Sequence, residues 1–171
     1  MRNVKVIDVI NAYEFDIKRL TLDKKNSNRT KLIQRDKYML QFLRTLPENM
    51  LLSCEGTPSD EYKLNAGSIT EMILKYHAKK DKEGRTLEKA GGLYDTKQGC
   101  INVEIKLSLN GSCYNTPIQE NCLIYLVNRD GVYMVRKDEI DEIVHNKKLP
   151  YNEWENAHRI EWLSERMGFN K

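Results

Sequence analysis

The chain has few of the residues that build soft metal centres or thiol active sites. Only four cysteines and three histidines occur among its 171 residues. The cysteines form no Cys-x-x-Cys pair, and no histidine stands at zinc-finger spacing from them. These residues are Cys54, Cys100, Cys113, Cys122, His77, His145 and His158. We therefore expect neither a zinc enzyme nor a cysteine nucleophile, and four reduced cysteines of an intracellular protein.

Long apolar runs are also absent. No segment approaches the ~20 apolar residues of a membrane-spanning helix, and the sequence from Met1 to Lys5 lacks the apolar core of a secretory signal. Apolar residues make up 40% of the chain and charged residues 31%, which leaves a lean core. A length of 171 residues is typical of one domain. We expect a single domain over 1–171, cytoplasmic and without a membrane partner.

Positive charge is concentrated in one segment, although the net charge is only +3. The segment 18–37 contains two aspartates and the cations Lys18, Arg19, Lys24, Lys25, Arg29, Lys31, Arg35 and Lys37. Such a patch attracts a phosphate backbone, whereas the alternative is an ordinary solvated helix face. The candidate nucleic-acid contacts here are Lys24, Lys25, Arg29, Lys31 and Arg35.

A strand with alternating apolar residues carries the most informative charges. Within 100–108, Ile101, Val103, Ile105 and Leu107 would share one face, and Asn102, Glu104 and Lys106 the other. A short strand ending at Asp95 and a Gln98-Gly99 turn precede it. Short connections favour antiparallel pairing, so we expect Asp95 beside Glu104. Two carboxylates and a lysine then suit a hard divalent cation and an attacking water.

This order of Asp95 followed by Glu104-x-Lys106 resembles the PD-(D/E)XK nuclease superfamily, which includes restriction endonucleases and Holliday-junction resolvases. The resemblance implies that Asp95, Glu104 and the backbone carbonyl of Ile105 bind Mg²⁺, for which Mn²⁺ can substitute. It also implies that Lys106 positions or deprotonates the attacking water. It covers roughly residues 65 to 136, and it departs at Tyr94, where proline is common in the family, and over 109–121, where the family usually has a helix.

Two further residues are candidates for the same site. The family often has a Gly-x-x-x-Glu pattern on a helix before the sheet, and Gly67 to Glu71 matches it. This implies a place for Glu71 at the edge of the catalytic site. The alternative is a capping box, in which Ser68 and Glu71 satisfy free backbone N–H groups at a helix start. Gln119 is a candidate nucleic-acid contact, although a plain loop amide is the simpler interpretation.

The periodicity predicts a mixed α/β fold, with a central mixed sheet of about four to five strands flanked by helices. The resemblance implies that this sheet is a restriction-endonuclease-like core over 65–136. Residues 1–48 are expected to form an N-terminal helical hairpin, and 137–171 C-terminal helices. The expected helices are 4–22, 29–46, a helix starting at 68, 137–147 and 151–167, and the expected strands are 50–52, 93–95, 100–108, 122–127 and 132–135.

The resulting expectation is a Mg²⁺-dependent DNA endonuclease that hydrolyses phosphodiester bonds in the manner of restriction enzymes. It would act as a homodimer, because cutting two strands needs two sites. One alternative keeps the chemistry and changes the substrate, as in a branched-DNA resolvase. The other is a non-catalytic nucleic-acid-binding or inhibitor protein that uses the basic segment.

Overall fold

The computed structural model describes residues 2–54, 66–78, 87–88, 96–98, 101–107, 109, 112–114, 122–136, 148–150 and 158–169. They belong to two compact units, Met1–Ile73 and Leu74–Lys171, each described here by itself. The prediction of a single domain stays a prediction.

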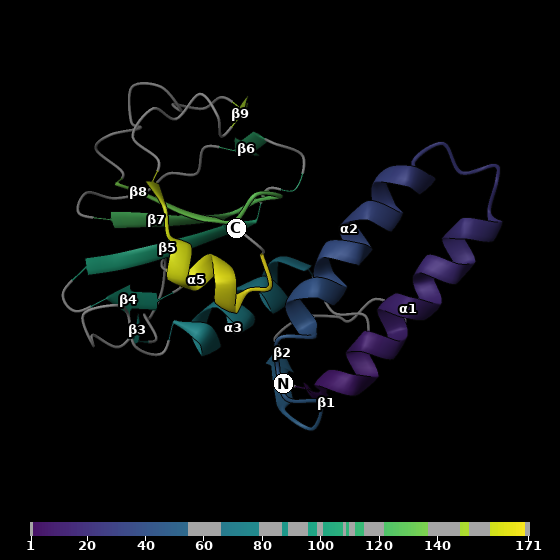
Figure 1. Ribbon diagram of the computed structural model, residues 1–171, viewed down its shortest axis with the longest axis horizontal. Coiled ribbons are helices and arrows are strands. Elements are labelled where there is room, and N and C mark those ends of the chain that lie inside the picture. Colours follow the sequence, from purple (N-terminus) through teal and green to yellow (C-terminus); the bar gives the residue numbers. More distant parts are fainter. Residues whose placement is uncertain are drawn as a thin grey trace. The chain divides into compact units, whose positions relative to one another are not determined.

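The first unit contains a helical hairpin, as predicted for the N-terminal segment. Its elements are β1 (Arg2–Lys5), α1 (Val6–Leu22), α2 (Arg29–Leu43) and β2 (Leu51–Cys54). Figure 1 shows α1 and α2 side by side, joined by the turn at 23–28. The prediction that the first helix begins at residue 4 is wrong. Residues 2–5 pair with β2 in an antiparallel ladder, so the backbone stays extended up to Lys5.

The hairpin is held together by apolar side chains at helical spacing. Those buried between the elements are Val6, Val9, Ile10, Tyr13, Leu20, Met39, Leu40, Phe42 and Leu43. Burial of one such large side chain contributes about 1.5–3 kcal/mol. The second helix ends at Leu43 rather than at 46, four residues before Pro47, which cannot continue a helix interior.

Two aspartates are buried with this apolar core. Asp16 is 3% exposed and pairs with Arg19 at 2.5 Å. Asp36 is fully buried, and its Oδ1 lies 4.0 Å from Nε of Arg35. Because an uncompensated buried carboxylate is costly, Arg19 and Arg35 have a structural role that the sequence did not reveal.

The second unit contains a mixed sheet. Its described strands follow the order β10-β8-β7-β5-β4-β3, in which β5 and β7 are parallel and every other neighbouring pair is antiparallel. The bounds are β3 Leu87–Glu88, β4 Thr96–Gln98, β5 Ile101–Leu107, β7 Cys122–Val127, β8 Val132–Arg136 and β10 His158–Arg159. These residues confirm the predicted mixed α/β class (Figure 1).

Three more elements complete the description. β6 (Ser112–Tyr114) and β9 (Lys148–Pro150) form a separate antiparallel pair, and α5 (Glu161–Arg166) follows β10. Helix α3 (Ala66–His77) crosses the boundary between the two units. Strand β7, which matches the predicted strand 122–127, is buried on both of its faces, because the side chains from Ile124 to Val127 are at most 3% exposed.

Several predicted elements are corrected. Helix α3 begins at Ala66, so Ser68 lies inside the helix and cannot be its N-cap residue, and the capping-box interpretation is wrong. The predicted helix over 151–167 is wrong at His158–Arg159, because these residues pair with β8 and the helix begins only at Glu161. Leu87–Glu88, which belong to none of the predicted strands, form β3. The predicted strand 93–95 and helix 137–147 lie outside the described residues.

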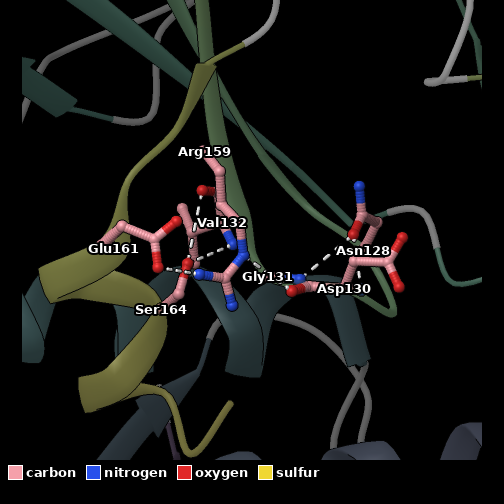
Figure 2. A network of polar contacts seen from close by, with 7 residues as sticks. All are labelled: Asn128, Asp130, Gly131, Val132, Arg159, Glu161 and Ser164. Carbon is pink, nitrogen blue, oxygen red and sulfur yellow. Dashed lines mark hydrogen bonds and ion pairs between the residues drawn. The ribbon is translucent and has the colours of Figure 1, made fainter. Parts of the chain in front are cut away.

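A polar network closes the turn between β7 and β8. Within this turn, Oδ1 of Asn128 accepts hydrogen bonds from the backbone N–H groups of Asp130 at 2.7 Å and Gly131 at 3.2 Å (Figure 2). The side chain of Asn128 is fully buried, and Gly131 has a φ of 152°. The chain thus uses an asparagine and a glycine where a turn needs a local acceptor and an unusual backbone angle.

The same turn is tied to the C-terminal segment. Nε of Arg159 donates to the carbonyl oxygen of Asp130 at 3.0 Å, and its guanidinium pairs with Glu161. Oγ of Ser164 in α5 accepts from the N–H of Val132 at 2.9 Å. Figure 2 shows these side chains converging on the turn. The network therefore fixes β10 and α5 against the β7–β8 hairpin.

His77, near the end of α3, gives stability a pH dependence. Burial lowers the pKa of His77 from its ordinary value of 6.5, and the positive charge of Arg166 lowers it further. Nη1 of Arg166 also donates to the backbone carbonyl of His77 at 2.7 Å. The folded imidazole thus resists protonation more than the unfolded one. The neutral imidazole of His77 therefore contributes its full share to the free energy of unfolding above pH 6.5. This stabilisation is lost as the pH falls toward the lowered pKa of the folded state.

We expect the wild-type free energy of unfolding to decrease when the pH is lowered from 7.5 to 5.5, and His77→Gln to show a smaller decrease. Urea denaturation of both proteins at the two pH values measures this, and each protein's value at pH 7.5 is its own control. Equal decreases in the two proteins would show that other groups cause the effect.

Candidate functional site

Strand β5, which carries the predicted catalytic residues, lies inside the sheet between β4 and β7. Its ladder with β4 pairs Thr96 with Val103, and its parallel ladder with β7 pairs Glu104 with Ile124 and Lys106 with Leu126. In the sequence, Asp95 directly precedes Thr96, and Glu104 directly follows Val103. The predicted motif therefore begins where the described part of the β4–β5 ladder ends.

Lys106 is partly packed against other side chains and partly exposed to solvent. It is half-buried and interacts with its neighbours, whereas the preceding Ile105 is 5% exposed. Leu126, which pairs with Lys106 on β7, is fully buried. Successive residues of a strand face opposite sides, so Ile105 packs into the core and Lys106 belongs to the other face. An ammonium group beside an apolar strand interacts more strongly with anions than one in water.

The remaining predicted catalytic residues are described only in part. Asp95 and Gln119 lie outside the described residues, and for Glu104 only the backbone is described. Within the described part of the chain, no group of three or more His, Cys, Asp or Glu side chains is arranged to hold a metal. The predicted metal set of Asp95, Glu104 and the Ile105 carbonyl therefore stays a prediction. Glu71 is half-buried on the part of α3 in the first unit, and its predicted role is also untested.

A basic cleft lies at the end of the helical hairpin. It has a volume of about 560 Å³ and is lined by Thr21, Lys24, Arg29, Thr30, Ile33, Gln34 and Lys37. This size is within the range of ~300–1,000 Å³ typical of ligand pockets. On α2, Arg29, Ile33 and Lys37 follow each other at four-residue spacing, which places them on one face of the helix. Thr21 and Lys24 complete the cleft from the end of α1 and the turn after it.

The three cations of the cleft have no carboxylate partner among the residues that the structure describes. The ion pairs found there involve Arg19, Arg35, Arg44 and Arg159 instead. Nη1 of Arg29 donates to the backbone carbonyl of Thr21, at 3.4 Å. The cleft therefore combines positive charge with hydroxyl and amide groups and contains no neutralising acid.

The structure brings together some of the predicted nucleic-acid contacts and separates others. Lys24 and Arg29 line the cleft, whereas Lys25 and Lys31 are exposed outside its lining and Arg35 lies beside Asp36. The sequence prediction included Lys37 in the basic segment but not among the candidate contacts, and it missed Thr21, Thr30 and Gln34. The four-residue spacing from Arg29 to Lys37 was a usable signal, but the participation of α1 residues depends on how the two helices pack.

Comparisons with known proteins give no relative: no family model, no curated protein and no solved structure matches the chain. The resemblance to the PD-(D/E)XK superfamily therefore remains a hypothesis based on the sequence motif. None of the helices in the described ranges has the length and apolar character needed to cross a bilayer.

Proposed function

We propose that the protein is a Mg²⁺-dependent DNA endonuclease of the PD-(D/E)XK type, with its site on β5 of a restriction-endonuclease-like sheet. The supporting observation is the register between Thr96 and Val103. One more pair in the same register would set Asp95 opposite Glu104, with Lys106 two residues further along β5. The proposal requires the ladder to continue by that one pair.

The chemistry of the proposed ligands suits magnesium. Asp95 and Glu104 offer carboxylate oxygens and Ile105 a carbonyl oxygen, and Mg²⁺ prefers oxygen donors. When bound, the cation supplies positive charge that stabilises the phosphate during hydrolysis. Strand alternation places Glu104 on the face of Lys106 in this proposal, so that one patch of sheet carries both charges.

In the proposal, Lys106 acts on the attacking water. Its ammonium group orients a water molecule toward the phosphorus and remains close to the negative charge that develops on the phosphate oxygens. The water oxygen forms the new P–O bond as the bond to the leaving oxygen breaks. The water gives a proton to solvent, and the leaving oxygen takes one from solvent to become a hydroxyl group. The half-buried position of Lys106 supports this role, because a lysine packed into the core would be unable to reach a substrate.

The basic cleft favours a second candidate, a nucleic-acid-binding or inhibitor protein without catalysis. Its cations attract phosphate whether or not β5 carries an active site. A branched-DNA resolvase differs from the first proposal only in its substrate. Both enzymatic proposals include a homodimer, because a two-fold pair of sites matches two antiparallel strands.

Incubation with supercoiled plasmid, linear duplex and four-way-junction DNA, each with Mg²⁺ or with EDTA, tests the proposal. We expect cleavage with Mg²⁺ and none with EDTA, since the cation is part of the site. Discrete fragments from duplex DNA indicate a restriction-type enzyme, and selective cutting of the junction indicates a resolvase. Binding to all three without cutting in Mg²⁺ or Mn²⁺ would contradict both and leave the non-catalytic candidate.

A further inference from the structure

The cleft at the end of the helical hairpin combines three features that together specify a ligand. It is large enough for several polar groups, it carries cations from two segments, and it has neutral hydrogen-bonding side chains between them. Ile33 adds one apolar wall. A surface helix whose charges are simply solvated gives scattered cations and no lined hollow.

The charges of the cleft are arranged for an anion. Lys24, Arg29 and Lys37 converge on the same hollow, and none forms an ion pair with a carboxylate in the described ranges. Of the two aspartates in segment 18–37, Asp36 is fully buried beside Arg35, and Asp23 is exposed without lining the cleft. Cations that line one hollow repel one another, and a bound anion removes this repulsion.

The start of α2 also favours a bound anion. Its first turn contains no acidic residue and begins with Arg29, although the positive end of a helix dipole disfavours cations. Asn28, the N-cap residue, makes no side-chain capping hydrogen bond. The N–H groups of Arg29 and Leu32 donate to the carbonyls of Asn26 and Asn28, at 3.2 and 3.0 Å, and no side-chain cap serves those of Thr30 and Lys31 between them. Such a helix start is stabilised by a bound phosphate.

We infer that this cleft is a phosphate-binding site for the backbone of a nucleic acid. Lys24, Arg29 and Lys37 contact non-bridging phosphate oxygens, and Thr30 and Gln34 donate hydrogen bonds to the same groups. Thr21 only lines the cleft, since its hydroxyl already donates to the carbonyl of Ile17 at 2.7 Å and a phosphodiester has no proton to donate to it. The inference rests on the proposed function only for the identity of the ligand, and it does not require cleavage.

Two triple variants with the same change in charge test the inference. The cleft variant is Lys24→Gln, Arg29→Gln and Lys37→Gln. The control variant is Lys5→Gln, Lys18→Gln and Arg44→Gln, whose exposed side chains come from the same unit but neither line the cleft nor belong to the predicted nucleic-acid contacts. Binding of the full chain to labelled single- and double-stranded DNA is measured by fluorescence anisotropy in EDTA, at several salt concentrations. EDTA removes divalent metal, so this assay measures binding alone. Its result does not depend on whether the protein cleaves DNA.

We expect the cleft variant to bind DNA at least about tenfold more weakly and the control variant about threefold or less. Each lost phosphate contact should also reduce the slope of log affinity against log salt by about 0.9. Equal losses in the two variants would overturn the inference, because they would show attraction to diffuse charge. Unchanged binding in the cleft variant, with thermal unfolding like that of the wild type, would overturn it as well.

Competition identifies the source of the phosphate. Unlabelled DNA should displace the labelled DNA at lower phosphate concentration than inorganic phosphate, tripolyphosphate or a mononucleotide. The contrary result is that tripolyphosphate or a mononucleotide binds the wild type more tightly than DNA does and binds the cleft variant weakly. It would show a small-molecule site and contradict the assignment to a nucleic acid backbone.

Discussion

Replacing Lys106 with alanine should abolish DNA cleavage and leave DNA binding unchanged. The proposed function gives its ammonium group a task during the attack on the phosphate and no task in holding the backbone. Loss of one such group typically costs about 100-fold to 10,000-fold in rate. Because the Lys106 side chain is only half-buried, we expect the fold to tolerate its truncation to alanine. Single-turnover cleavage of a labelled substrate in Mg²⁺ measures the rate, and anisotropy in EDTA measures binding.

Lys75→Ala is the matched control, because Lys75 is another half-buried lysine but lies on α3 and outside the proposed site. It should cleave at about the wild-type rate. A Lys106→Ala protein that cleaves as fast as this control would remove Lys106 from the mechanism. A parallel loss of binding and cleavage would mean that Lys106 holds substrate and takes no part in the chemical step.

Replacing Gly131 with alanine should destabilise the second unit strongly. A Cβ atom at this position would lie 2.6 Å from Nε of Arg159 and 2.8 Å from Oγ of Ser164. Neither atom can move without loss, since the first donates to the carbonyl of Asp130 and the second accepts from the N–H of Val132 (Figure 2). The φ of 152° adds strain for any residue with a side chain.

Backbone strain and overpacking each cost about 1–3 kcal/mol, so we expect a loss of about 2–4 kcal/mol in the free energy of unfolding. Urea denaturation followed by circular dichroism measures it. Gly67→Ala is the control, because Gly67 lies within α3 and alanine favours a helix by up to about 1 kcal/mol. If Gly131→Ala were as stable as this control, the network in Figure 2 would not constrain the turn.

The sequence predicted those parts of the fold that are dictated by local pattern. The predicted strands 122–127 and 132–135 correspond to β7 and β8, which pair in an antiparallel ladder. The basic segment also gave two residues of the cleft, Lys24 and Arg29. In each case the information lies within a few neighbouring residues, where periodicity and turn chemistry are strong.

The failures concern residues whose state is decided by distant partners. His158 and Arg159 lie in a segment whose apolar residues have helical spacing, but they pair with β8 and form an edge strand. Residues 2–5 are extended because β2, almost fifty positions later, pairs with them. The place of Thr21 in the cleft likewise depends on the packing of α1 against α2. Single-sequence patterns carry no record of these contacts, and tertiary pairing overrides a weak local preference.

Titration with Mn²⁺, followed by the electron paramagnetic resonance signal of the free ion, tests the proposed metal site most directly. Mn²⁺ accepts the same oxygen ligands as Mg²⁺, and its free concentration can be measured without DNA. The account predicts saturable binding to the wild type and to Lys106→Ala, and much weaker binding to Asp95→Asn and to Glu104→Gln. Wild-type affinity in both carboxylate variants, or no saturable binding to the wild type, would contradict it.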